Sequence, residues 1–357
     1  MMDKIKVAIT QGDTNGIGLE VVLKAINDEH ITELFTPVVF ANHHAFRHAL
    51  AMIGEEKLPL NYIDTPSDAL EGRINIVNVG NSPVTPVYGE GTPVSGTAAV
   101  ESLVAACNSL DDEETDVLVT APIDKGAAQV DGFNFVGHTE FLEERFGDEE
   151  HHARMLLFND ELRVMLQTTH LPISGIAQHI TREWVLDSIR VLNKTLVESF
   201  EIERPRIAVL SLNPHNGDHG LLGREEIDEI SPAIEEAREE GILAFGPYAA
   251  DGFFGSDNRR AFDGILAMYH DQGLAPFKAL ARQSGVNYTA NLSVVRTSPD
   301  HGTAFDIAGR NEADGTSMRE AIYRAIDIYR ARRRYEEMSL NPLKKYKESK
   351  SDSAGAQ

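Results

Sequence analysis

Three histidines occupy equivalent positions at the ends of short apolar segments. His170, His215 and His270 each stand where such a run ends and the sequence becomes polar. If the runs are strands of an open α/β sheet, the histidines lie beyond the carboxyl ends of those strands, which is where such sheets bind ligands. Three protein ligands that leave one coordination position open are typical of catalytic metal sites. The pattern therefore indicates a divalent metal site, although each histidine could instead cap its strand through a loop carbonyl.

A cation, an amide and a second cation recur at intervals of nine residues, as Lys278, Asn287 and Arg296. Ammonium and guanidinium groups donate charge-assisted hydrogen bonds, so this segment could bind a small dianion or a carboxylate. In an acidic chain the two cations could equally pair with neighbouring carboxylates. The spacing alone leaves both interpretations open.

A second candidate for anion binding is the segment Gly137-His138-Thr139-Glu140, which precedes a helix expected over residues 140–146. Thr139 is expected to be the N-cap of that helix. Free backbone N–H groups at a helix N-terminus favour an anion such as phosphate. Simple capping of the helix explains the same residues.

Two glycine-containing loops differ in what they indicate. Residues 12–18 lack both the G-x-G-x-x-G spacing and the phosphate-loop lysine, so they are interpreted as a tight strand–helix turn without a nucleotide. Residues 301–306 are interpreted as a loop that enters a helix, where the backbone could approach a ligand closely.

The composition excludes several classes of protein. The 357 residues include 56 acidic and 33 basic side chains, a net charge of −23, which argues against a nucleic-acid partner. The single cysteine, Cys107, excludes a disulfide framework and multi-cysteine metal sites, and a buried structural role is expected for it. No apolar signal region and no segment approaching the roughly 18 apolar residues of a membrane helix are evident. A cytoplasmic protein without a membrane partner is expected.

The elements that must position these residues alternate along the chain. Near-continuous apolar runs predict buried strands, and segments with helical periodicity lie between several of them. We therefore predict an α/β fold with a largely parallel or mixed sheet covered on both sides. The tail at residues 344–357 is expected to be disordered. The predicted strands are residues 5–10, 37–40, 74–79, 117–120, 164–168, 207–212, 265–268 and 293–297, and the predicted helices are residues 17–27, 97–110, 181–200, 225–240 and 316–333.

Taken together, these segments resemble the 4-hydroxythreonine-4-phosphate dehydrogenase family. The matching words occur in order across residues 12–309 and are specific: VTAPIDK at 119–125, GHTE at 137–140, LNPH at 212–215, GPYAAD at 246–251, YHDQG at 269–273 and RTSPDHGT at 296–303. Departures from the family pattern are Thr14 and Leu19, in place of prolines, and Asn291 and Ser293, in place of a glycine and a proline.

The resemblance implies a two-domain fold like that of isocitrate and isopropylmalate dehydrogenases, without a Rossmann domain. Residues 1–125 and 265–340 would form the first domain, and residues 126–264 the second. It also implies a homodimer whose active site is shared between subunits. By position it assigns a divalent metal (zinc, magnesium or cobalt) to His170, His215 and His270, and the substrate to His138, Thr139, Lys278, Asn287 and Arg296.

The activity implied is oxidation of 4-phosphooxy-L-threonine by NAD, or alternatively NADP, followed by decarboxylation, in pyridoxal 5′-phosphate biosynthesis. The cofactor is expected near His301, Gly302, Thr303 and Asp306. Lys278, Asp251 and Asp271 are candidates for proton transfer or for orienting the metal ligands. Three alternatives stay open at this point. They are a phosphorylated threonate or erythronate as substrate, a metal-dependent hydrolase or lyase without NAD, and a non-catalytic binding protein.

Overall fold

The computed structural model describes residues 4–28, 30–54, 58–130, 133–135, 137–148, 151–281 and 284–342. Within them the strands form one 12-stranded sheet in the order β3-β4-β2-β1-β5-β12-β11-β6-β7-β10-β8-β9. The strands are β1 (Lys6–Thr10), β2 (Thr36–Ala41), β3 (Leu60–Ile63), β4 (Ile74–Asn78), β5 (Val117–Val119), β6 (Arg154–Phe158), β7 (Arg163–Leu166), β8 (Arg206–Leu210), β9 (Leu243–Tyr248), β10 (Gly264–Ala267), β11 (Val286–Ala290) and β12 (Arg296–Pro299).

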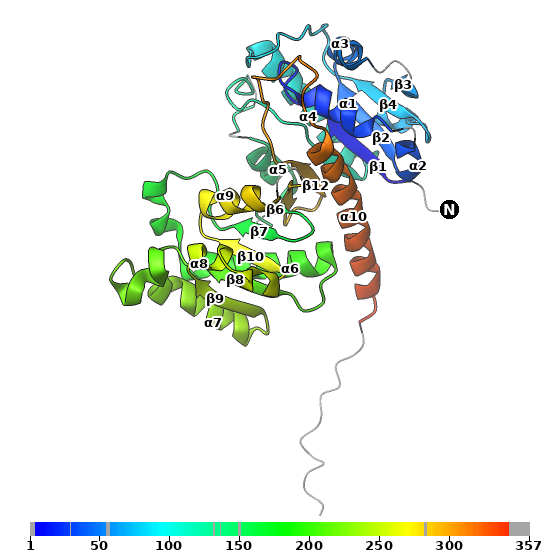
Figure 1. Cartoon of the computed structure of the whole chain (residues 1–357). Helices are drawn as coiled ribbons and strands as arrows, with labels where there is room; N and C mark the ends of the chain where they lie inside the picture. Colours follow the sequence, from blue (N-terminus) through cyan, green and yellow to red (C-terminus); the bar gives the residue numbers. More distant parts are fainter. Residues whose placement is uncertain are drawn as a thin grey trace, which may run out of the picture.

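The sheet consists of two parallel blocks joined by an antiparallel centre. Strands β3, β4, β2, β1, β5 and β12 are parallel to one another, as are β7, β10, β8 and β9. Between the blocks, β11 is antiparallel to both β12 and β6, and β6 is antiparallel to β7. Figure 1 shows the two blocks above and below this junction.

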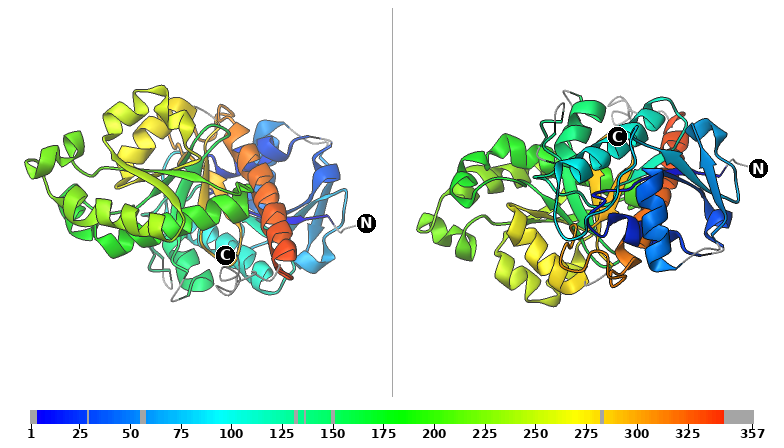
Figure 2. Two further views of the ribbon diagram at one scale, coloured as in Figure 1. Left: turned by 90° about the horizontal axis from the view of Figure 1, so that it is seen from below. Right: turned by 90° about the horizontal axis from the view of Figure 1, so that it is seen from above.

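Helices cover the sheet on its faces (Figure 2). Local signals set several of their ends: Asn42 accepts backbone hydrogen bonds at the start of α3, and Thr92 forms a capping box with Ser95 at the start of α4. The α-helices are α1 (Gly18–Ile26), α2 (Ile31–Leu34), α3 (His43–Ile53), α4 (Pro93–Asp111), α5 (His138–Phe146), α6 (Arg182–Phe200), α7 (Ser231–Glu239), α8 (Ala250–Phe254), α9 (His270–Ala281) and α10 (Thr316–Ser339). Short 3-10 or π segments are η1 (Pro66–Asp68), η2 (Ile173–Gly175), η3 (Ala177–His179), η4 (Pro214–Gly220), η5 (Glu226–Ile230) and η6 (Asp257–Ala261).

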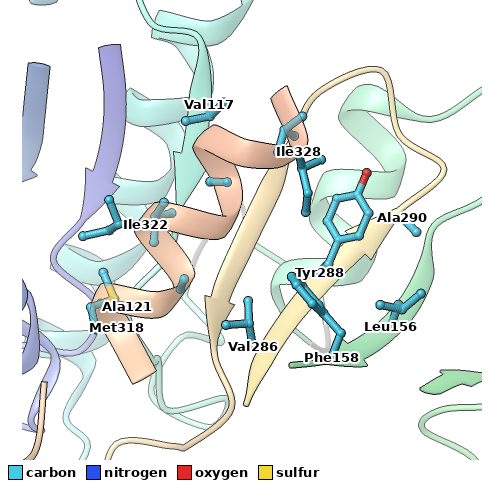
Figure 3. Close-up of a cluster of buried hydrophobic side chains, with 14 of the residues drawn as sticks. Val117, Ala121, Leu156, Phe158, Val286, Tyr288, Ala290, Met318, Ile322 and Ile328 are labelled. Atoms are coloured by element: carbon cyan, nitrogen blue, oxygen red, sulfur yellow. The ribbon is translucent and has the colours of Figure 1, made fainter. Parts of the chain in front are cut away.

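Helix α10 packs across the junction of the two blocks. Its apolar face, which includes Met318 and Ile322, lies over the central strands (Figure 3). There it shares a buried cluster with Val286 and Tyr288 of β11 and with Phe158 of β6. Burying this surface stabilises the junction by roughly 25 cal/mol for each Å² of apolar area removed from water. The centre of the sheet is therefore a packed core and not a linker.

The predicted α/β class with a mixed, mainly parallel sheet is confirmed. All six predicted helices, including that at residues 140–146, are present. Seven of the eight predicted strands match to within about two residues, and the strand predicted at residues 293–297 is shifted to Arg296–Pro299 (β12). Strands β3, β6, β9 and β11 were not predicted. The division into two domains stays a prediction. Strand β10 lies at the predicted boundary near residue 265, and it pairs with β7 and β8, which belong to the second predicted domain. The predicted disordered tail lies outside the described residues, and none of the described helices is long and apolar enough to cross a membrane.

Candidate active site

A cavity of about 270 Å³ lies at the junction of the two blocks. Its walls come from the end of β5, the start of α5, strands β6, β11 and β12, the loop after β7, and helix α9 (Figure 1). Nine residues of the sequence-based site line it: His138, Thr139, His170, His270, Lys278, Asn287, Arg296, His301 and Gly302. Residues that are far apart in the sequence therefore meet in one place.

Arg296 lies at the floor of the cavity and is almost fully buried, with 2% of its surface exposed. Burial is the main reason that the pKa of its guanidinium falls to about 10, still well above neutrality. Neither Arg296 nor Lys278 has a carboxylate within ion-pair distance among the described residues. The Nζ atom of Lys278 instead donates to the backbone carbonyl of Asp300 at 2.7 Å. Of the two interpretations of the nine-residue spacing, the geometry supports an anion site.

Two further cavity residues hold polar atoms that have no partner in the described structure. Nε2 of His138 and Oδ1 of Asn287 are buried and make no hydrogen bond. Burial, followed by the nearby charges of Arg296 and Lys125, holds the pKa of His138 well below its usual value, so the ring is neutral. Buried polar groups are normally hydrogen-bonded, so these two atoms are available to a ligand.

His170 and His270 face each other across part of the cavity, with ring centroids 6.4 Å apart. Nδ1 of His170 lies 2.9 Å from Oε1 of Glu140, and Nδ1 of His270 lies 2.7 Å from Oδ1 of Asp271. An ionised carboxylate only accepts hydrogen bonds, so each Nδ1 carries a hydrogen, which leaves Nε2 as the ring nitrogen that could bind a metal. Histidine ligands of metals are oriented in this way by a carboxylate. These two residues therefore fit a metal ion.

His215 is placed differently. It follows β8, and β7, β10 and β8 are neighbours, so all three predicted metal ligands do follow adjacent parallel strands. His215 does not line the cavity, however, and is exposed. Among the described residues no three histidine, cysteine, aspartate or glutamate side chains come close enough to hold a metal ion. A single chain thus supplies two of the three predicted ligands at the cavity.

The backbone around His215 is strained. Residues 215–219 all have left-handed backbone angles, with φ between 43° and 74°. Each non-glycine residue in that region costs about 1–2 kcal/mol. Buried Glu226 holds the preceding segment, because its carboxylate accepts hydrogen bonds from the backbone N–H groups of Leu212 and Asn213. Strain of this kind is often found at functional sites.

The remaining predicted residues lie at the edge of the site or outside it. Asp271 contacts His270, whereas Asp251, on α8, is exposed and does not line the cavity. Thr303 and Asp306 also lie outside the cavity walls, and the Thr303 carbonyl accepts a hydrogen bond from Ile17 N–H at 3.0 Å.

Two local predictions were wrong. Thr139 is not the N-cap of α5, which begins at His138, so that Gly137 is the capping residue and makes no side-chain bond. Residues 301–306 do not lead directly into a helix, since turns follow and the next helix begins at Thr316.

Among the cavity-wall residues that sequence reasoning missed are Lys125, Glu140 and Thr120. Nζ of Lys125 lies 3.2 Å from Nε2 of His170. The hydrogen bond from His170 is the main reason that the pKa of Glu140 is lowered, which keeps this group ionised. All three belong to the words VTAPIDK and GHTE that carried the family resemblance. Membership of these words was the one sequence feature that could have indicated them.

Comparisons with known proteins show the family of the chain. The family model described as pyridoxal phosphate biosynthetic protein PdxA matches residues 33–325. A 4-hydroxythreonine-4-phosphate dehydrogenase from Bacteroides thetaiotaomicron is 48% identical over 353 residues, which cover 98% of this chain and 96% of that protein. A relative from Oceanobacillus iheyensis, provisionally named a D-threonate 4-phosphate dehydrogenase, is 38% identical over 332 residues, which cover 92% and 99%.

A solved structure agrees in fold over nearly the whole chain. The crystal structure of 4-hydroxythreonine-4-phosphate dehydrogenase from Klebsiella pneumoniae superposes with a TM-score of 0.77 and 32% identity, covering 92% of this chain and all of that one. The predicted family and fold are thereby confirmed. The chain belongs to the pyridoxal phosphate biosynthetic protein PdxA family, and it is an oxidoreductase.

Proposed function

We propose that this chain oxidises 4-phosphooxy-L-threonine at its 3-hydroxyl, with NAD as hydride acceptor and with a divalent metal. The product, 2-amino-3-oxo-4-phosphobutanoate, would decarboxylate to 3-amino-2-oxopropyl phosphate, in the cytoplasm and in pyridoxal 5′-phosphate biosynthesis. The observation that carries this proposal is that the cavity holds a cation and a pair of histidines in different places. Its floor holds the uncompensated cation Arg296, and its wall holds two imidazoles whose Nδ1 atoms lie beside carboxylates.

The chain's own residues would bind and orient the substrate. Arg296 and Lys278 would hold its anionic groups, and Asn287 would use its unpartnered Oδ1 to accept a hydrogen bond. Neutral His138 and the adjacent Thr139 would complete the contacts at the start of α5. Fixing the substrate in one orientation lowers the entropic part of the barrier. Lys278 is our candidate for the proton-transferring group.

Two parts of the site would hold the cofactors. A metal on His170 and His270 would polarise the substrate hydroxyl and stabilise negative charge on its oxygen. His215 would complete the ligand set in a homodimer whose active site is shared between subunits. For NAD, or alternatively NADP, we propose the loop of His301, Gly302, Thr303 and Asp306. Nε2 of His301 is buried without a partner, and nothing lies within 4 Å of a Cβ built on Gly302.

A second substrate class deserves a direct comparison because of the relative from Oceanobacillus iheyensis. A phosphorylated threonate or erythronate would present the same phosphate, carboxylate and 3-hydroxyl groups as the threonine derivative. It would lack the amine, and the cationic floor does not select for an amine. The site geometry therefore supports a phosphorylated hydroxyacid in either case.

The test is NADH formation from 4-phosphooxy-L-threonine, measured beside 4-phospho-threonate and 4-phospho-erythronate, with and without chelator. We expect chelator-sensitive turnover, fastest with the threonine derivative. Faster turnover of threonate or erythronate phosphate would indicate that the enzyme acts in another pathway. Turnover without any change in NADH absorbance would indicate a hydrolase or lyase, and no turnover with metal present would refute the proposed site.

A further inference from the structure

Arg296 is held by threonines on both neighbouring strands. It lies on β12, between β5 and β11. Oγ1 of Thr120, directly after β5, accepts hydrogen bonds from Nε of Arg296 at 3.1 Å and from Nη2 at 2.6 Å. Oγ1 of Thr289, on β11, accepts one from Nη1 at 2.9 Å. The plane of the guanidinium is therefore fixed from two sides.

The two threonines fix this cation without neutralising it. Both are buried, with exposures of 0% for Thr120 and 1% for Thr289. A buried charge is costly unless it is paired, yet a carboxylate in either position would cancel the charge. A guanidinium has five N–H donors, and the three bonds to threonine leave one hydrogen on each terminal nitrogen. Those two hydrogens have no protein acceptor among the described residues and remain for an oxyanion.

Thr120 and Thr289 differ in one respect that concerns the ligand. Thr120 lines the cavity, whereas Thr289 does not. A threonine hydroxyl has two lone pairs and one hydrogen, and Thr120 Oγ1 already accepts two hydrogen bonds. Its hydrogen must therefore point away from Arg296. Within the described chain no acceptor for that hydrogen is found.

We propose that Thr120 is a further substrate-binding residue, which donates its hydroxyl hydrogen to the same oxyanion that Arg296 binds, and that Thr289 is a positioning residue for Arg296. The oxyanion is a phosphoryl or carboxylate group. This inference rests on the proposed function only for the identity of the whole substrate. The oxyanion site itself follows from the buried cation and its two neutral acceptors.

Three variants separate these roles: Thr120→Val, Thr120→Ser and Thr289→Val. With 4-phosphooxy-L-threonine, we expect Thr120→Val to raise KM by about 10–100-fold and to change kcat little, because a hydrogen bond to a charged group is lost. Thr120→Ser keeps the hydroxyl and should restore KM to within about threefold of the original. Thr289→Val removes only a bond that orients Arg296 and should raise KM several-fold less than Thr120→Val.

Binding of simple anions gives a readout that does not require turnover. Inorganic phosphate and acetate, titrated calorimetrically into each purified variant, distinguish a phosphoryl from a carboxylate site. We expect Thr120→Val to weaken the binding of one of these anions at least tenfold. Its thermal unfolding midpoint should fall, because two hydrogen bonds to buried Arg296 are also lost. Equal weakening by Thr120→Val and Thr289→Val, or none by either, would overturn the inference. If no phosphorylated hydroxyacid is turned over but anion binding falls only in Thr120→Val, the proposed function fails and this inference stands.

Discussion

Oε1 of Glu140 lies 2.9 Å from Nδ1 of His170, so that a carboxylate on α5 sets the tautomer of an imidazole in the loop after β7. The other ring nitrogen of His170 points to Nζ of Lys125, at 3.2 Å. An ammonium group can only donate, so a hydrogen bond between these two atoms requires a lone pair on Nε2. Glu140 is therefore expected to control how well His170 binds a metal.

Replacing this carboxylate tests the proposed metal site. We expect Glu140→Gln to weaken metal binding about 10–100-fold, the usual effect of losing the carboxylate that orients a histidine ligand. Competition with a chromophoric chelator would measure the affinity. Glu143→Gln is the matched control, because Glu143 is on the same helix but bonds His152. Unchanged affinity in Glu140→Gln, with weakened binding in His170→Ala, would show that Glu140 does not act through His170.

The buried thiol of Cys107 should affect stability at high pH. Burial raises its pKa to about 12, above the usual 9.0. Below pH 9 the folded and unfolded states both keep the proton, so the group has no effect. Between pH 9 and 12 only the unfolded state loses it, so the free energy of unfolding falls by up to about 1.4 kcal/mol for each pH unit. Urea unfolding at pH 8, 9 and 10 should show a shallower decline in Cys107→Ala, and parallel declines would contradict the assignment.

Two glycines with left-handed backbones make a matched pair for the turn that carries His215. A Cβ on Gly217 would lie 2.6 Å from Oε2 of Glu226, whereas one on Gly241 would meet nothing within 4 Å. Gly241→Ala should cost about 1 kcal/mol, from the left-handed backbone alone. Gly217→Ala should cost at least about 1 kcal/mol more, because a buried carboxylate must move. Equal losses in urea unfolding would mean that Glu226 does not hold the turn closely.

The proposed cofactor loop can be tested by adding bulk at Gly302. Because a Cβ there meets no atom within 4 Å, Gly302→Ala and Gly302→Trp should both fold. We expect KM for NAD to change little in Gly302→Ala and to rise about tenfold or more in Gly302→Trp. Metal affinity and the thermal unfolding midpoint serve as controls in the same variants. If Gly302→Trp binds NAD normally, the cofactor lies elsewhere.

Sequence patterns located the strands that are apolar on both faces, because burial on both sides leaves a continuous apolar run. They missed β11, since Val286–Ala290 includes the polar residues Asn287 and Thr289, which interrupt the apolar run. They also missed β3, an edge strand that is mostly only half-buried. The positions of His170, His215 and His270 after β7, β8 and β10 followed from the runs that were recognised.

Those sequence patterns could not predict which site residues contact one another. Glu140 and His170 are 30 residues apart, and Lys125 and His170 are 45 apart. Thr120 and Arg296 are separated by 176 residues. Periodicity reports how a segment is buried, and it contains no information on which distant segment it meets. Only the family resemblance indicated that these residues belong together.

The antiparallel centre of the sheet has a consequence for how the molecule moves. The chain's two halves share backbone hydrogen bonds through β12, β11 and β6, and these strands also form the floor of the cavity. The halves cannot swing apart as rigid bodies on a flexible connection without breaking those bonds. The amide protons of β11 should therefore exchange with solvent mainly through global unfolding, and hydrogen exchange measured residue by residue would check this.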